Sequence, residues 1–364
     1  MRQPFVTRIA SLHSHRGWLL FAVLAAAVMI LMPVLNRAVP PDSAFYVPNW
    51  MLTLMGRFLC LALVALALDL IWGYTGILSL GHGAFFALGG YVMGMHLTHN
   101  QYDDGSVPNF IRFIGESDWP WFWVPFEHFW FTAIMIFLVP GLLAFIFGFF
   151  AFRSRVRGVY FAIITQALTF ATMLLFFRTE TGLGGDTGLT DFDTLLGFSV
   201  READTRLVLY LCSGLAVILA YLVCRYIVTS KLGRVLMAIR DAESRVRFTG
   251  YNPLRYKLFV WTFSAMLCGL AGALYVPQTG VINPSEMAPS ESIEMAVWVA
   301  LGGRGTLIGA LAGAGIVNGV KSWVTAAHPD LWLFVLGAMF VLVTLFLPRG
   351  VVGLVDQLKG GRKQ

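Results

Sequence analysis

Six polar residues interrupt long apolar runs of this 364-residue chain, and they are the first candidates for chemistry: His82, Thr165, Gln166, Thr169, Glu294 and Asn318. Polar groups inside apolar segments of membrane length are costly, and they commonly mark a substrate or ion pathway. On a helix, Thr165 and Thr169 share one face, and Gln166 is offset by about 100°. Two plainer interpretations stay open: His82 as a packing residue, and the amides of Gln166 and Asn318 as links between helices.

The sequence offers no pattern typical of catalysis or metal binding. It contains no plausible Ser/His/Asp or paired-carboxylate set, and its four cysteines lack metal-ligand spacing. The glycine-rich stretch 182–188 lacks the Lys-Ser/Thr that ends a nucleotide-binding P-loop, and no such motif occurs elsewhere in the chain. We therefore expect a protein that is not an enzyme, binds no cofactor directly, and takes energy from a partner or a gradient.

Composition predicts an all-α, polytopic membrane protein with one domain over residues 1–364. The chain is 57% hydrophobic and only 13% charged, whereas an ordinary soluble domain carries about 25% charged residues. Runs of about 20 apolar residues span a bilayer as helices. About ten membrane-spanning or half-spanning helices are predicted, the eighth of them too short for a straight crossing: 18–35, 51–72, 77–98, 129–152, 159–177, 206–228, 258–276, 292–301, 306–323 and 331–347. The first run has basic residues before it, but no clean cleavage site follows, so we expect a retained span.

Charge is distributed unevenly between the two sides of this predicted topology. Of the 26 Lys and Arg residues, 19 fall in segments that share one side. Positive residues concentrate on the cytoplasmic side of membrane proteins. We therefore expect both chain ends in the cytoplasm and the loops 99–128 and 178–205 outside. The formal charge of +6 thus reflects membrane topology and predicts no nucleic-acid partner.

Residues 229–257 form a charged island between two of the apolar runs. Apolar residues recur there at near-helical spacing among the charges, which predicts a short amphipathic helix ended by Gly250 and the Asn-Pro pair 252–253. A basic cytoplasmic loop exposed to solvent is the plainer interpretation. The alternative is a helix that docks on a partner.

Five segments resemble, in order, the branched-chain amino-acid family of ATP-binding-cassette (ABC) permeases. They are GYTGILSLGHGAFFALGGY at 73–91, RGVYFAIITQALTFA at 157–171, the island at 231–257, GGRGTLIGALAG at 302–313 and LPRGVVGL at 347–354. The resemblance covers residues 57–354. It implies an ABC importer permease fold in a bacterial inner (plasma) membrane.

The resemblance also implies the partners and the coupling residues. The partners are a second homologous permease subunit, two ABC ATPase subunits that use ATP and Mg, a periplasmic substrate-binding protein and the lipid bilayer. The island resembles the family's coupling loop, and it carries Asp-Ala-Glu where that motif usually has Glu-Ala-Ala. The implied ATPase-coupling residues are Arg240, Asp241, Ala242, Glu243 and Gly250.

Within the family, three segments are most similar to the urea-transport branch, namely 164–192, 275–289 and 333–350. Asp186 and Thr187 stand where that branch usually has Asn-Asn. Urea is flat and neutral, so it needs amide, hydroxyl and carbonyl partners rather than a pair of opposite charges. Import of branched-chain amino acids or short amides is the alternative, and a stand-alone channel or gradient-driven transporter is an alternative of another class.

Overall fold

The computed structural model describes residues 15–353 except 41, 44, 103–105, 116–117, 157 and 348–349. Its α-helices are α2 (His15–Ala26), α3 (Met32–Arg37), α4 (Asn49–Thr75), α5 (His82–Gln101), α6 (Asn109–Phe113), α7 (Phe129–Arg153), α8 (Val159–Phe177), α9 (Ala203–Thr229), α10 (Lys231–Phe248), α11 (Pro253–Thr279), α12 (Pro289–Gly302), α13 (Leu307–Ala327) and α14 (Trp332–Phe346). A π-helix, η1 (Ala27–Leu31), joins α2 to α3, and the 3-10 helices are η2 (Val124–Glu127), η3 (Thr179–Thr181), η4 (Pro284–Met287) and η5 (Pro329–Leu331). The strands are β1 (Leu189–Thr190), β2 (Thr194–Leu195), β3 (Phe198–Ser199) and β4 (Val281–Ile282), paired antiparallel as β1–β4 and β2–β3.

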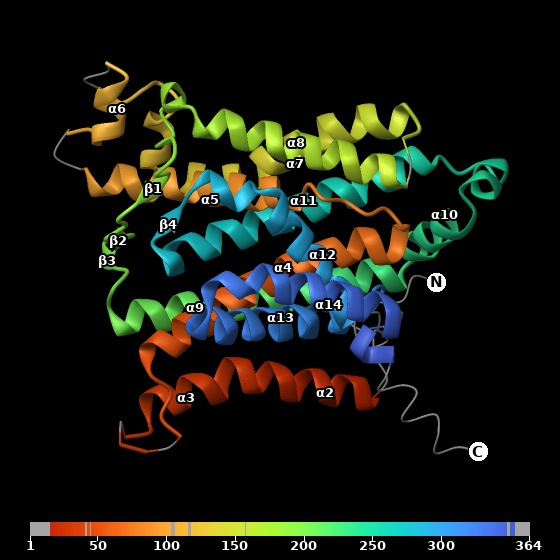
Figure 1. The fold of residues 1–364 in the computed structure, drawn as a ribbon, viewed down its shortest axis with the longest axis horizontal. Helices are drawn as coiled ribbons and strands as arrows, with labels where there is room; N and C mark the ends of the chain where they lie inside the picture. Colours follow the sequence, from red (N-terminus) through yellow and green to blue (C-terminus); the bar gives the residue numbers. More distant parts are fainter. Residues whose placement is uncertain are drawn as a thin grey trace, which may run out of the picture.

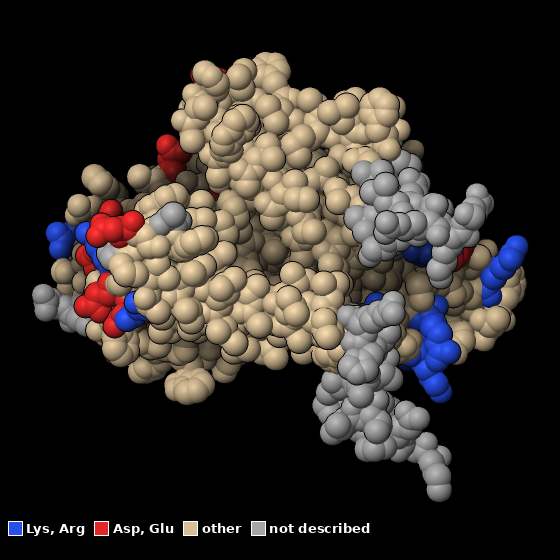
Figure 2. Space-filling view, turned by 90° about the horizontal axis from the view of Figure 1, so that it is seen from below, with Lys and Arg blue, Asp and Glu red and all other residues tan. Residues whose placement is uncertain are grey.

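The prediction of an all-α polytopic membrane protein is confirmed. Among the described residues, seven helical segments are long and apolar enough to cross a membrane, the α2–η1–α3 helix among them. The helices α5, α12 and α14 account for the other three predicted runs. On the face shown in Figure 2, charged side chains gather at the two ends of the molecule and leave an uncharged band between them, which is the surface a bilayer requires.

The helices α4 and α11 run antiparallel through the middle of the bundle (Figure 1). Arg57 near the start of α4 donates to the carbonyl of Gln278 near the end of α11, and Ser264 donates to the carbonyl of Ala67 further along. The helix α5 packs tightly on α11, because Gly272 leaves room for the backbone of α5. An added Cβ at Gly272 would lie 1.9 Å from the carbonyl oxygen of Phe86.

The two central helices begin two similar units of opposite direction. Each has 27 residues and ends in Thr-Gly, and Gly76 and Gly280 adopt nearly identical left-handed conformations with φ of 74° and 75°. Each is followed by a stretch without α-helix and then by a shorter α-helix, α5 or α12. Because α4 and α11 are antiparallel, the units form an inverted repeat of the kind found in transporters with discontinuous helices.

The third predicted run, 77–98, is wrong at its start. Residues 76–81 are not helical, and α5 begins only at His82. Gly76 ends α4 by its positive φ, which apolar composition alone does not reveal. The run 292–301 was expected to be short, and α12 has only 14 residues.

The helix α10 lies at one end of the bundle, and the strands lie at the opposite end (Figure 1). The helix α2 begins and α14 ends at the end that carries α10 (Figure 1). The described parts of the loop 99–128 and the loop 178–205 lie at the opposite end, as the predicted topology requires. The predicted positions of the chain ends concern residues 1–14 and 354–364, which fall outside the described part of the chain.

We predict that Gly272→Ala lowers thermal stability, because the new methyl group meets backbone that must shift. Overpacking of this kind costs about 1–3 kcal/mol. The matched control is Gly319→Ala in α13, where an added Cβ meets no described atom within 4 Å. Thermal unfolding of the purified variants should show a lower midpoint for Gly272→Ala only, and equal midpoints for both variants would contradict the tight α5–α11 contact.

Candidate translocation site

The six predicted pathway residues separate into two groups. His82, Thr165 and Thr169 surround the non-helical stretch 76–81, with Gln166 beside them on α8. Glu294 and Asn318 lie on α12 and α13, which pack against each other. No hydrogen bond among the described residues connects the two groups.

Two threonines of α8 hold the stretch 76–81 in place. The Thr165 hydroxyl accepts a hydrogen bond from the Leu80 N–H at 3.1 Å and donates to the Ala162 carbonyl at 2.9 Å. The Thr169 hydroxyl lies 3.4 Å from the Leu80 carbonyl and 3.0 Å from the Thr165 carbonyl. Non-helical backbone at membrane depth needs such partners, since lipid offers none. Both hydroxyls therefore already have a structural role.

His82 is held at both ring nitrogens. Its Nε2 lies 2.8 Å from the Ser264 hydroxyl, and its Nδ1 lies 3.1 Å from the Ser79 hydroxyl. Because Ser264 donates its own proton to the Ala67 carbonyl at 2.5 Å, Nε2 is assigned as the donor to the Ser264 hydroxyl. With 1% of its surface exposed, His82 fixes the start of α5 against α11. A contact between His82 and substrate stays a prediction.

Gln166 differs from its neighbours because its carboxamide has unused hydrogen-bonding capacity. Both its nitrogen and its oxygen are buried and have no hydrogen-bond partner among the described residues. Leaving such groups unpaired costs about 1–3 kcal/mol each. A buried donor and acceptor on one planar amide match a solute that offers an acceptor and a donor side by side.

Glu294 belongs to an ionic cluster, and its place in a substrate pathway stays a prediction. Its Oε2 accepts hydrogen bonds from Lys321 Nζ at 2.9 Å and from Trp332 Nε1 at 3.2 Å. Glu291 lies 3.7 Å from the same Lys321 ammonium. The second carboxylate oxygen of Glu294 is buried without a partner in the described chain. A buried carboxylate at this depth is stabilised by the ammonium beside it.

Asn318 uses its amide within its own helix, where Nδ2 donates to the Ala314 carbonyl at 2.8 Å. Lys321 follows one turn later and is a site residue that sequence reasoning missed. Its signal was present, because a lone lysine in the apolar run 306–323 needs an acidic partner, and Glu294 was already expected at membrane depth.

The amphipathic helix predicted in the charged island is confirmed as α10, with a kink at Ala242, whose φ and ψ of −155° and 73° are not helical. Just before the kink, the Arg240 guanidinium donates to the Gly73 carbonyl at 2.9 Å and to Asp241 at 2.9 Å. Just after it, the Glu243 carboxylate binds Lys257 at 2.7 Å and Arg247 at 2.8 Å. Arg240 and Glu243 thus attach α10 to α4 and α11.

The C-terminal end of α10 follows these contacts. Phe248 is 92% exposed, whereas Leu236 and Ile239 are buried. Gly250 has a φ of 84° and open space around it, which confirms the helix end expected there. Contact of the five coupling residues with an ATPase stays a prediction.

Arg240 also connects α10 to both inverted units. Its side chain packs on Gly76, where the non-helical stretch begins. Gly73, which accepts its hydrogen bond, lies against Gly305 in the turn after α12. The N–H of Gly305 in turn donates to the Asp69 carboxylate at 2.7 Å. A displacement of α10 would therefore also displace the ends of α4 and α12.

The fold and this site define a multi-pass helical permease with discontinuous helices. The chain belongs to the family described as "Branched-chain amino acid transport system / permease component", whose profile matches residues 50–344. It is 26% identical over 320 residues to the high-affinity branched-chain amino acid transport system permease protein LivM of Salmonella typhimurium and to that of Escherichia coli K12, covering 82% of this chain and 69% of each relative. It is 24% identical over 310 residues to LivH of Salmonella typhimurium, covering 80% of this chain and 91% of that relative. No solved structure matches the chain.

We predict that Gly250→Val impairs transport, whereas Gly250→Asn is tolerated. Valine resists a positive φ, while asparagine adopts it with little strain. Among the described residues nothing lies within 4 Å of an added Cβ, so a clash at Cβ does not distinguish the two variants. Uptake by membranes with equal amounts of inserted protein should fall for the valine variant and stay near wild type for asparagine. Full uptake by the valine variant would show that the turn at Gly250 is not needed for coupling.

Proposed function

We propose that this chain is a membrane-spanning permease subunit of an ABC importer that carries urea across the inner membrane by alternating access. Its partners would be a second homologous permease, two ATPase subunits and an external substrate-binding protein. Membership of a transport-system family supports the importer. The likeness of segments 164–192, 275–289 and 333–350 to the urea branch supports the substrate.

One structural observation carries the substrate proposal, namely the unpaired carboxamide of Gln166. Urea carries N–H donors and a carbonyl acceptor, so it can replace both missing partners at once. An amino-acid zwitterion needs an anion and a cation. Glu294 and Lys321, the charged pair of the second group, already bind each other at 2.9 Å.

A branched-chain amino acid is the second candidate, because the LivM and LivH relatives carry that substrate in their names. The two candidates are separated by uptake of labelled urea and labelled leucine into vesicles that contain the complete complex. We expect ATP-dependent urea uptake that leucine does not compete with. Saturable leucine uptake without urea uptake would establish the second candidate.

We predict that Gln166→Leu lowers urea uptake by about five- to a hundredfold, since two neutral hydrogen bonds are lost and each contributes roughly 0.5–1.5 kcal/mol. The control is Thr172→Val on the same helix, whose hydroxyl bonds only the Leu168 carbonyl among the described residues. Uptake rates at equal protein amounts should separate the two variants. If Gln166→Leu keeps full uptake but loses assembly with the partner permease, the carboxamide connects subunits instead.

A further inference from the structure

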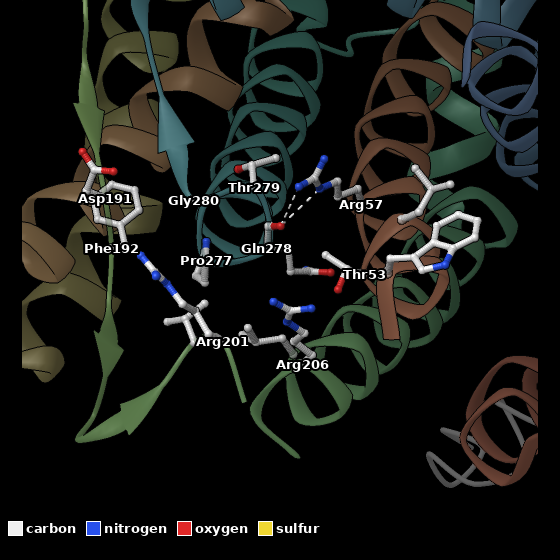
Figure 3. Close-up of a pocket in the computed structure, with 14 residues that line it drawn as sticks. Thr53, Arg57, Asp191, Phe192, Arg201, Arg206, Pro277, Gln278, Thr279 and Gly280 are labelled. Atoms are coloured by element: carbon white, nitrogen blue, oxygen red, sulfur yellow. Dashed lines mark hydrogen bonds between the residues drawn. The ribbon is translucent and has the colours of Figure 1, made fainter. Parts of the chain in front are cut away.

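A pocket of about 510 Å³ lies at the end of the bundle opposite α10, apart from the groups described above. It is formed by the start of α4, the start of α9, the end of α11 and the segment 191–201 (Figure 3). Apolar walls and three arginines, Arg57, Arg201 and Arg206, line it. The guanidinium groups come from three separate elements and gather around one space.

Two of these arginines lack a carboxylate partner in the described chain. Arg201 pairs with Asp193 at 3.0 Å. Arg57 donates from Nε and from its terminal nitrogen to the Gln278 carbonyl, at 3.1 and 2.9 Å, which is a neutral acceptor at the end of α11. The Arg206 side chain makes no hydrogen bond or ion pair with any described residue, and Figure 3 shows it extending into the pocket between α9 and α4.

The carboxylate that borders the pocket does not neutralise this charge. Asp191 accepts a hydrogen bond from its neighbour Thr190 at 2.9 Å, and Figure 3 shows its carboxylate directed away from Arg206. Of the nearby carboxylates, Asp193 already pairs with Arg201, and Asp204, two residues before Arg206, already pairs with Arg37. The pocket therefore presents two guanidinium groups that attract an anion from outside the described chain.

We propose that this pocket receives an acidic side chain, Asp or Glu, of the external substrate-binding protein. The proposal rests on the importer function proposed above. Guanidinium groups bind carboxylates through paired hydrogen bonds, which fix orientation as well as position. A neutral substrate such as urea supplies no anion, whereas a protein that docks at this end can. Complementary charge of this kind speeds and orients docking.

The test measures binding of the purified binding protein to the complete complex in nanodiscs. The double variant Arg57→Gln with Arg206→Gln should weaken binding by at least about tenfold, the change expected when two charge-assisted contacts are lost. The salt dependence of binding should become shallower, because fewer charges meet. Arg201→Gln is the matched control, since Asp193 already pairs with that arginine, and its effect should stay below about threefold.

Two further variants keep the proposal testable if the double glutamine variant fails to assemble. Arg57→Lys with Arg206→Lys retains the charge and should bind within about tenfold of wild type. Arg206→Glu should lose binding, and one Asp/Glu→Arg change on the binding protein should restore it. Unchanged binding by the glutamine or glutamate variants would overturn the pocket assignment.

The outcomes separate this proposal from the function on which it rests. If the wild-type complex does not bind any external binding protein, the importer function fails. If the wild type binds and the double variant binds equally, only the pocket assignment fails. Arg206-dependent binding of free leucine or acetate, with unchanged docking, would make this a solute pocket and would also overturn the proposal.

Discussion

Non-helical backbone inside the bundle needs hydrogen-bond partners that lipid cannot supply, and much of this structure follows from that constraint. The stretch 76–81 is served by Thr165, Thr169 and the hydroxyl of Ser79, which accepts from the Gly81 N–H. The corresponding stretch after α11 is served differently. It pairs as β4 with β1, and the Asn283 side chain accepts from the backbone of Ser285. Thr165 and Thr169 are therefore first of all the partners of broken backbone.

Breaks in the helices also suggest how a movement of α10 could reach the candidate translocation site. A continuous helix would transmit a push along its axis, whereas a broken unit can move at the break. Arg240 contacts α4 where it ends and the non-helical stretch begins. Asp69 connects that place to the turn after α12. The helix α10 is thus connected to both inverted units through contacts at the end of the bundle.

Apolar composition predicted the ten helices and the fold class, because burial in lipid is a property of composition. Asp69, inside the second apolar run, is fully buried and accepts a hydrogen bond from the Gly305 N–H, since a carboxylate at this depth needs a partner. The break at 76–81 was not predicted, since it depends on the conformation of Gly76 rather than on hydrophobicity. The arginine pocket escaped prediction because Arg57, Arg201 and Arg206 meet only in the folded chain. The sequence shows three positive charges, but only the tertiary contacts show which arginine has a carboxylate partner.

The central claim is that a small neutral amide passes the unpaired carboxamide of Gln166. A cryo-electron microscopy map of the complete importer, trapped with urea during turnover, tests this claim most directly. The account predicts density of urea size within hydrogen-bond distance, about 3 Å, of both the nitrogen and the oxygen of this side chain. Substrate density elsewhere, with the Gln166 carboxamide bonded to a neighbouring subunit, would contradict it.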